Sequence, residues 1–576
     1  MPEMWKEVVS YEQVLEGFEA MSKDAERVQR ETLKKILERN VGTEYLQKWG
    51  LEGRTDPEHF KACVPLVTHA DLEPYIQRIA DGDESPILTT ERISVISMSS
   101  GTTNGRQKYV PWNNDLLSMS VEIYRISSAY RTRLFPIKSG GRVLEFNYSS
   151  KQFNTKGGLV ACTATTNLFR DETFKINKGS KVLPCSPDEV LFGYDARQSL
   201  YCHLLCGLIY SNDVEFLAST FAYSIVDAFR HFEQVWQDLC KDIKEGKLSD
   251  RITVPFMRAS VSKLLKPDPG LADEIFEKCK NMQNWYGVIP QLWPNAKYIH
   301  SIMTGSMEPY SRKLRHYAGN LPLISADYGA TEGWIAANID PTTSPEDTIF
   351  TVVPSLAFFE FIPLQWHQED WKVESEPVGL TEVKVGQIYE VAFTTAGGLY
   401  RYRLGDVVRV SSFYNSTPQL SYVCRKNLLL TVNIDKTTEK DLQISVQNAL
   451  QLFREENVEL VDFTSYADMS TDPGHYVIFW ELSDSVDDKV LNKCCTVMDE
   501  SFVDPGYVGS RKAKTIGPLE LRIVEKGTFQ KILDHYLSIG AVVSQFKTPR
   551  CIKANQDLFD ILNNGVIQTY FSTFLS

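Results

Sequence analysis

Short apolar runs typical of β-strands alternate with amphipathic helical segments along much of the chain. Strands are predicted at residues 143–148, 322–325 and 356–362, and helices at 222–243 and 259–265. Such an alternation favours layers of helices packed on a sheet, because each apolar strand face and helix stripe has to be buried against another element. We therefore predict an α/β fold.

The order of the predicted elements changes beyond about residue 425. A helix, two strands, a helix, a strand and a helix are predicted at residues 438–455, 459–463, 476–482, 487–502, 519–525 and 530–537. This is a compact α+β unit of ordinary domain size. We therefore predict a large α/β domain over residues 1–425, a hinge at 426–435 and a smaller, mobile α+β domain over 436–576.

The net charge and the cysteine pattern limit the classes of partner and the cellular compartment that we expect. The formal net charge of the 576-residue chain is -13, which disfavours binding to nucleic acid. Eleven cysteines without a C-x-x-C pair indicate reduced thiols in a cytosolic protein. The start lacks a signal-peptide core, and no apolar run reaches the ~18 residues that a membrane span needs. We expect a cytoplasmic monomer with no nucleic-acid or membrane partner.

A segment rich in glycine and hydroxyl groups follows an apolar run near residue 96. Residues 97–108 read SMSSGTTNGRQK, which predicts a loop after a strand that ends at residue 97. Residues 113–115 then offer an N-cap for a helix that reaches Tyr130. Glycines let the backbone approach a phosphate closely, and N–H groups, hydroxyls and Lys108 can contact the anion. The segment is not a Walker A motif, because Lys108 lies three residues past Gly105 and Tyr109 follows it. An ordinary surface turn would have a similar composition.

Two further motifs supply carboxylates. The first, YGATE at residues 328–332, follows an apolar run, and a strand-end turn of this kind can hold a nucleotide and magnesium, with Glu332 as metal ligand. A helix N-terminus would explain the same residues. The second, YRYRLGD at 400–406, places Asp406 after a glycine, where it can accept hydrogen bonds from a ribose. A salt bridge between Arg403 and Asp406 is the alternative.

A lysine near the end of the chain is the last candidate. Residues 545–550 read QFKTPR, and Lys547 lies in the predicted mobile domain. A lysine on such a domain can reach over a triphosphate when the domain closes. A solvated surface lysine would have the same sequence.

Together, SSGTTNG, YGATE and YRYRLGD resemble the motifs of the plant Gretchen Hagen 3 acyl acid amido synthetases, in the same order and spacing. Further blocks such as NWYGVIP, MTGSMEPY and SRKAKTIGPLELR extend the resemblance over essentially the whole chain. Within that family the chain is most similar to the jasmonate-conjugating branch. That branch often has YGSSE where this chain has YGATE, and Thr331 keeps a hydroxyl group.

The resemblance implies a fold and a reaction. The fold is the luciferase-like adenylating type, with a large N-terminal α/β domain and a smaller rotating C-terminal domain. The reaction uses ATP and Mg²⁺ to convert a carboxylic acid into an acyl-adenylate, which an amino acid then attacks to form an amide. Jasmonic acid and isoleucine are the expected substrates, and hormone signalling and defence the expected setting.

The resemblance also assigns roles to individual residues. It places Lys547 and Glu332 in catalysis, with Glu332 on the metal. Nucleotide contacts are expected from Ser97, Ser99, Ser100, Thr102, Asn167, Gly329, Ala330, Thr331, Glu332, Asp406 and Lys547. The acyl acid is expected against Leu117, Ser120, Phe221 and Trp334, and the amino acid against Thr166, Gly527, Thr528, Phe529 and Lys531. For these last two groups, core packing explains the same residues.

Other functions fit parts of this pattern. An auxin or benzoate amido synthetase would share the family motifs, and an acyl-CoA ligase would share the adenylation step but transfer to a thiol. A hormone-binding protein that keeps the fold without catalysis is a third alternative. Intact Glu332, Asp406 and Lys547 argue against the last of these.

Overall fold

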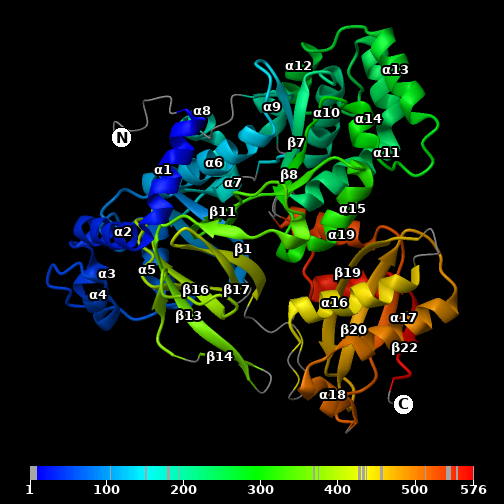
Figure 1. Cartoon of the computed structure of the whole chain (residues 1–576). Coiled ribbons are helices and arrows are strands. Elements are labelled where there is room, and N and C mark those ends of the chain that lie inside the picture. Colours follow the sequence, from blue (N-terminus) through cyan, green and yellow to red (C-terminus); the bar gives the residue numbers. More distant parts are fainter. Residues whose placement is uncertain are drawn as a thin grey trace.

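The computed structural model describes residues 10–103, 106–149, 152–177, 182–193, 195–367, 370–373, 375–425, 430, 432, 435, 437–453, 458–512, 514–539, 546–552 and 556–574. Within these ranges the chain forms four sheets, three before residue 426 and one after residue 459 (Figure 1). The predicted fold class, a large N-terminal α/β domain with a smaller C-terminal domain, is confirmed. The predicted hinge at 426–435 lies mostly outside the described residues and stays a prediction.

A five-stranded parallel sheet forms the centre of the first domain. Its order is β6 (Leu183–Pro184), β3 (Arg142–Glu145), β7 (Val214–Phe221), β8 (Ile299–Ile302) and β9 (Leu323–Ser325). Parallel strands need crossover connections, and helices supply them. The helices around this sheet are α9 (Asp188–Leu191), α10 (Ala196–Ile209), α11 (Ala222–Glu245), α12 (Pro255–Ser262), α13 (Pro269–Cys279), α14 (Val288–Leu292) and α15 (Glu308–Ala318).

A second, four-stranded sheet carries the glycine-rich segment. Its order is β2 (Arg106–Trp112), β1 (Val95–Thr103), β5 (Val160–Thr163) and β4 (Phe153–Asn154). The expectation of a loop directly after residue 97 is wrong, because β1 continues to Thr103. Pairing with β2 resumes at Thr102 after an irregularity that begins at Met98, so the segment is the distorted arm of a hairpin.

A nine-stranded antiparallel sheet contains both carboxylate motifs. Its strands are β10 (Tyr328–Ala330), β11 (Gly333–Ala337), β12 (Phe350–Val352), β18 (Thr417–Arg425), β17 (Tyr402–Tyr414), β16 (Ile388–Thr394), β13 (Phe358–His367), β14 (Asp370–Val373) and β15 (Val378–Gly379). One core joins it to N-terminal helices that include α1 (Tyr11–Lys23), α2 (Ala25–Asn40), α3 (Glu44–Gln47), α4 (Pro57–Cys63), α5 (His69–Asp81) and α6 (Asn114–Leu134). The short helices α7 (Ala164–Arg170) and α8 (Glu172–Asn177) follow β5.

The C-terminal unit is a sheet with helices on both faces. The sheet order is β19 (Leu460–Asp468), β20 (His475–Leu482), β21 (Glu520–Val524) and β22 (Val566–Phe571). Its helices are α16 (Glu439–Leu450), α17 (Asp488–Ser501), α18 (Pro505–Lys512), α19 (Thr528–Ser538) and α20 (Gln556–Asn564). Side chains of β20 alternate between two cores: Trp480 packs with α16 and α17, and Phe479 with α19 and α20.

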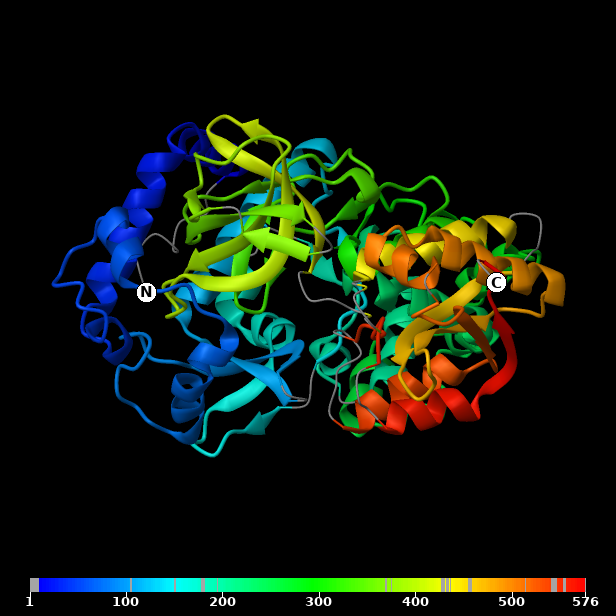
Figure 2. The ribbon, with the colours of Figure 1, turned by 90° about the horizontal axis from the view of Figure 1, so that it is seen from below.

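The unit lies beside α11 and α15 in two perpendicular views (Figures 1 and 2). The predicted α-β-β-α-β-α order is confirmed, while α18, α20 and β22 were not predicted. In the part of the chain that is described, no helix combines the length and the apolar character that crossing a membrane demands.

A buried arginine ties the N-terminal helices to the antiparallel sheet. Arg401 is 5% exposed, and its guanidinium donates to both carboxylate oxygens of Glu360 on β13 at 2.8–3.2 Å. It also donates to the carbonyl oxygens of Lys61 and Val64, each at 2.7 Å. One charged side chain thus joins the end of α4 to the strands on which YRYRLGD begins.

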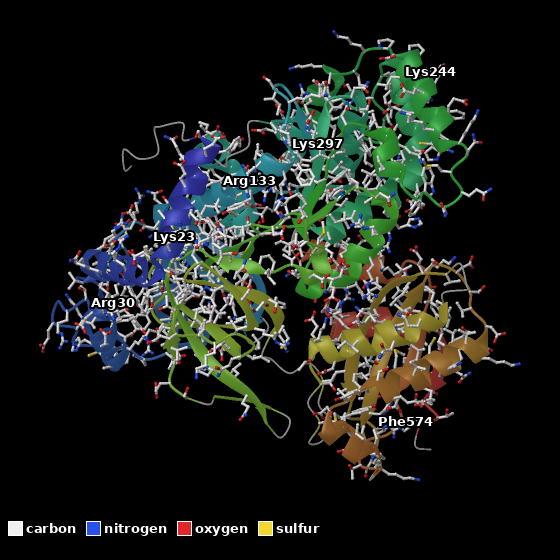
Figure 3. The ribbon with its side chains drawn as sticks, in the orientation of Figure 1. Lys23, Arg30, Arg133, Lys244, Lys297 and Phe574 are labelled. Atoms are coloured by element: carbon white, nitrogen blue, oxygen red, sulfur yellow. The ribbon has the colours of Figure 1, made fainter. Side chains whose placement is uncertain are left out.

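We expect Glu360→Gln to lower the free energy of unfolding by roughly 3–5 kcal/mol, because it leaves the Arg401 charge buried without its carboxylate. Urea unfolding followed by tryptophan fluorescence measures this change. Glu58→Gln is the matched control, because Glu58 pairs with Arg30 on the outer side of α2 with both side chains at least half exposed (Figure 3). That change should cost less than about 1 kcal/mol. Equal losses in the two variants would contradict the assigned role of Glu360.

Candidate active site

The two carboxylate motifs hold each other through exchanged hydrogen bonds. The Tyr328 hydroxyl, in YGATE, donates to Asp406 Oδ2 at 3.0 Å, and the Tyr402 hydroxyl, in YRYRLGD, donates to Glu332 Oε1 at 3.0 Å. Asp406 is 4% exposed and Glu332 is 5% exposed. Each of these two buried carboxylates therefore accepts a hydrogen bond from a tyrosine hydroxyl of the other motif.

The alternatives left open by the sequence are excluded at both motifs. Thr331 and Glu332 form the turn between the antiparallel strands β10 and β11, so they are not a helix N-terminus. Arg403 pairs with Glu390 at 2.6 Å and not with Asp406. Asp406 lies inside β17 directly after Gly405, whose φ of +80° is a backbone conformation that favours glycine.

The glycine-rich hairpin contacts the same turn. Trp112, the last residue of β2, donates from Nε1 to the Thr331 carbonyl oxygen at 2.9 Å. The partner strand β1 runs parallel to β5, with Ser97 opposite Cys162 and Met98 opposite Thr163. Thr163 caps α7 and contacts the Thr166 hydroxyl at 3.0 Å. The predicted phosphate segment and the TATTN segment, which also contains Asn167, are thus neighbours.

The hydroxyl groups of the hairpin differ in how far the structure describes them. Ser97 is fully buried, and its Oγ has no hydrogen-bond partner among the described residues. Ser99 is 7% exposed. The side chains of Ser100 and Thr102 lie outside the described part of the structure. A buried hydroxyl without a partner is costly unless something else satisfies it, so Ser97 is suited to contact a polar ligand.

The predicted acyl-acid residues on α6 lie against β11. Trp334 donates from Nε1 to Ser120 Oγ at 2.8 Å, and its ring packs edge-on against Tyr124. Gly329 lies flat against this indole, where a Cβ would come within 2.4 Å of a ring carbon. Leu117 packs against the same core half-buried. Ser120 and Trp334 are therefore brought together, and Gly329 makes room for the ring.

The structure also brings Lys547 and Phe221 together. The Lys547 ammonium lies 4.8 Å from the centre of the Phe221 ring, at the carboxyl end of β7. In the parallel sheet, β8 separates β7 from β9, and β9 leads directly into Tyr328. Ligands of open α/β sheets bind at the carboxyl ends of the strands, and Lys547 lies at the carboxyl end of β7, two strands from β9.

The predicted amino-acid residues at the start of α19 have structural partners. Glu481 accepts from the backbone N–H groups of Gly527 and Phe529, each at 2.8 Å, and so caps the helix. Thr528 is fully buried and donates to the Glu525 carbonyl oxygen, while Lys531 pairs with the Glu525 carboxylate. Gln530 accepts from Arg197 on α10, so this turn borders the first domain.

Asp327, Tyr328 and Tyr402 were missed as site residues. The two tyrosines stand inside the quoted motifs, but nothing in the sequence pairs them with carboxylates 70 to 78 positions away. Asp327 accepts from the Asn338 backbone N–H and the Ser127 hydroxyl. Burial raises the pKa of Asp327 despite the nearby Arg131 and these hydrogen bonds.

Magnesium is implied by the family resemblance, and Glu332 fits it. No group of three or more His, Cys, Asp or Glu side chains that could hold a metal occurs among the described residues. Mg²⁺ bound to a triphosphate needs only one or two protein carboxylates, because phosphates and water complete its shell. Glu332 Oε2 accepts no hydrogen bond from the described residues and so remains available for such a role.

Three family models and several known proteins match this chain. The GH3 family N-terminal, central and C-terminal domain models match residues 14–323, 350–425 and 440–556. A jasmonoyl–L-amino acid synthetase, JAR6, of Nicotiana attenuata is 60% identical over 98% of this chain and 97% of its own length. An indole-3-acetic acid-amido synthetase, GH3.10, of Arabidopsis thaliana is 53% identical over 98% of each chain.

A solved structure agrees in fold over the whole length. The GH3.15 acyl acid amido synthetase superposes with a TM-score of 0.90 at 36% identity, covering 99% of this chain and 98% of that chain. Because three successive GH3 domain models match the chain and its relatives match over the full length, the chain belongs to the GH3 family.

Proposed function

We propose that this protein is an ATP-dependent acyl acid amido synthetase that joins jasmonic acid to an amino acid, most favourably isoleucine. The observation that carries the proposal is that YGATE and YRYRLGD hold each other's carboxylates and that YGATE contacts the hairpin of the glycine-rich segment, while Lys547 lies at the carboxyl end of β7. The full-length similarity to a jasmonoyl–L-amino acid synthetase supports the choice of acid. In this proposal the enzyme acts as a cytoplasmic monomer.

The proposed reaction has two steps. An oxygen of the acid's carboxylate attacks the α-phosphorus of ATP, the bond to the bridging oxygen breaks, and pyrophosphate leaves. The amino acid's amine then attacks the acyl carbon, loses a proton, and AMP leaves. Both steps need positioning and charge stabilisation more than a covalent nucleophile.

The proposal gives each part of the site a task. Asp406 accepts hydrogen bonds from the ribose, and the β1–β2 hairpin with Thr331 contacts the phosphates. Glu332 would hold Mg²⁺, which when bound neutralises charge on the triphosphate. Lys547 faces the departing pyrophosphate. Ser120, Trp334 and Phe221 border the acyl acid, and residues 527–531 the amino acid.

An auxin-conjugating enzyme is the second candidate, since a relative with that name is 53% identical over the full length. We expect the purified protein, with ATP and Mg²⁺, to conjugate jasmonic acid to isoleucine faster than indole-3-acetic acid to aspartate. Mass spectrometry of amide products from a panel of acids and amino acids measures the preference. Faster auxin conjugation would reject the jasmonate assignment, and a product that requires coenzyme A would reject amide synthesis.

We expect Asp406→Ala to weaken ATP binding by roughly 1.5–3 kcal/mol, the range for a lost hydrogen bond to a charged group. The KM for ATP should rise accordingly, while the KM for the acid should change little. Tyr328→Phe is the matched control, because it removes the donor to Asp406 and keeps the carboxylate. If Tyr328→Phe raises the KM for ATP as much as Asp406→Ala does, Asp406 acts through the hydrogen bond and not on the ribose.

We expect Lys547→Ala to slow acid-dependent ATP–pyrophosphate exchange by about 10²–10³-fold, because a positioned cation stabilises charge in the adenylation transition state. Amide formation from preformed jasmonoyl-adenylate should survive, since that step breaks no phosphoanhydride bond. Lys489→Ala, at an exposed lysine of the same domain, should leave both reactions unchanged. Unchanged exchange in Lys547→Ala would remove Lys547 from the mechanism.

A further inference from the structure

A buried aspartate of the C-terminal unit bonds to a tyrosine of the first domain. Asp462, on β19, accepts from the Tyr310 hydroxyl of α15 at 2.8 Å. Tyr310 is 1% exposed and Asp462 is 5% exposed. Tyr310 lies in the segment that the N-terminal family model matches, and Asp462 lies in the segment that the C-terminal model matches. The bond is therefore a buried contact between the two parts of the molecule.

The same aspartate holds the segment that carries Lys547. Thr548 donates from its hydroxyl to Asp462 Oδ2 at 2.7 Å, and Arg550 donates from a terminal nitrogen to Asp462 Oδ1 at 2.6 Å. Arg550 also donates to the Tyr310 hydroxyl oxygen at 3.2 Å. Residues one and three positions after Lys547 thus share a carboxylate and a tyrosine with the domain interface.

The Asp462 carboxylate is charged, which strengthens the hydrogen bonds that it accepts. Burial alone would raise the pKa of Asp462, but Arg550 and the nearby Lys313 outweigh burial and hold that pKa at about 2. Asp462 is therefore ionised at neutral pH, and its hydrogen bonds are charge-assisted. If the domains separated, the Tyr310 hydroxyl would leave an ionised carboxylate with one donor fewer.

Weaker polar contacts surround this centre along the same face. Lys313 of α15 donates to the Val461 carbonyl oxygen at 2.5 Å, and Arg230 of α11 donates to the same oxygen at 3.4 Å. Lys440 of α16 pairs with Glu308 of α15 at 3.0 Å. Apolar side chains such as Phe546, whose ring packs against Tyr223, complete the interface. Among its polar contacts the Tyr310–Asp462 bond is the buried one, so it is the polar contact whose loss should matter most.

We propose that Tyr310 and Asp462 form a latch that sets the orientation of the C-terminal domain in which Lys547 reaches the carboxyl edge of the parallel sheet. Tyr310 is then a positioning residue that acts through Lys547. The inference rests on the proposed function for the role of Lys547. The latch itself rests on the contacts between α15, β19 and residues 548–550.

The central test is Tyr310→Phe, which removes one hydroxyl group and keeps the ring that packs on Tyr223. We expect ATP–pyrophosphate exchange to slow by roughly 10-fold to 100-fold, the effect of one lost charge-assisted hydrogen bond on the population of the latched orientation. The KM for the acid should change little. Amide formation from preformed acyl-adenylate should not slow.

Tyr223→Phe is the matched control. Tyr223 lies in the same aromatic cluster, with Tyr310 and Phe546 against its ring, and its hydroxyl has no hydrogen bond to the described residues. We expect this variant to exchange at the wild-type rate. Equal slowing by Tyr223→Phe and Tyr310→Phe would show that the cluster acts by packing and would overturn the latch.

A double mutant separates positioning from general destabilisation. If Tyr310 acts through Lys547, adding Tyr310→Phe to Lys547→Ala should slow exchange no further, because there is no ammonium left to position. Multiplied effects would overturn the proposal. This comparison requires that Lys547→Ala alone slows exchange, which the proposed function predicts independently.

A readout without catalysis distinguishes failure of the latch from failure of the proposed function. Lys313 lies at the interface, where its ammonium donates to the Val461 carbonyl oxygen, so its amine becomes more accessible to a reagent when the two parts separate. We expect Tyr310→Phe to raise acetylation of Lys313 by acetic anhydride several-fold relative to the exposed Lys489, by mass spectrometry. Unchanged labelling would overturn the latch even if the wild type shows no exchange with any acid.

Discussion

The position of the YRYRLGD motif depends on one buried guanidinium, that of Arg401. Arg401 gives its donors to Glu360 and to two carbonyl oxygens at the end of α4, so its position is fixed from two elements at once. Its φ of +46° is unusual for a residue with a side chain, and such a conformation persists only where the surroundings determine it. Its neighbours Tyr400 and Tyr402 are buried on either side and reach Leu88 and Glu332.

The neutral donor on Glu332 has a chemical consequence. An arginine in the place of Tyr402 would orient the Glu332 carboxylate but would also cancel the charge that a metal ion has to meet. The Tyr402 hydroxyl orients this carboxylate without neutralising it. Arg403, only three residues from Asp406, is instead engaged by Glu390, which keeps its charge on another carboxylate. The electrostatics of the site therefore depend on a pairing outside it.

Sequence periodicity predicted the layers of helices and strands, but it did not predict the side-chain contacts that form the candidate site. The helix after the glycine-rich segment begins where Asn113 caps it, and the strands leading into YGATE and through 476–482 appear as predicted. The glycine-rich segment was misread, because strand pairing with β2 overrides its loop-like composition. The Tyr–carboxylate bonds and the capping of α19 by Glu481 join residues 46 or more positions apart, for which a single sequence carries no local signal.

The C-terminal unit has one core of its own and one that it shares with the first domain. The α16 and α17 face of its sheet forms a separate core, whereas the apolar side chains under α19 and α20 belong to the same core as the parallel sheet. Toward the first domain it therefore presents polar partners, such as Asp462 and Lys440, together with apolar ones, such as Phe546 against Tyr223. Separating the two parts would expose apolar surface as well as break polar contacts, so it would cost more free energy than opening a purely polar interface. In the proposed reaction Lys547 acts in the first step alone, so the C-terminal unit would have to leave this shared core, and its separate core under α16 and α17 would keep it folded.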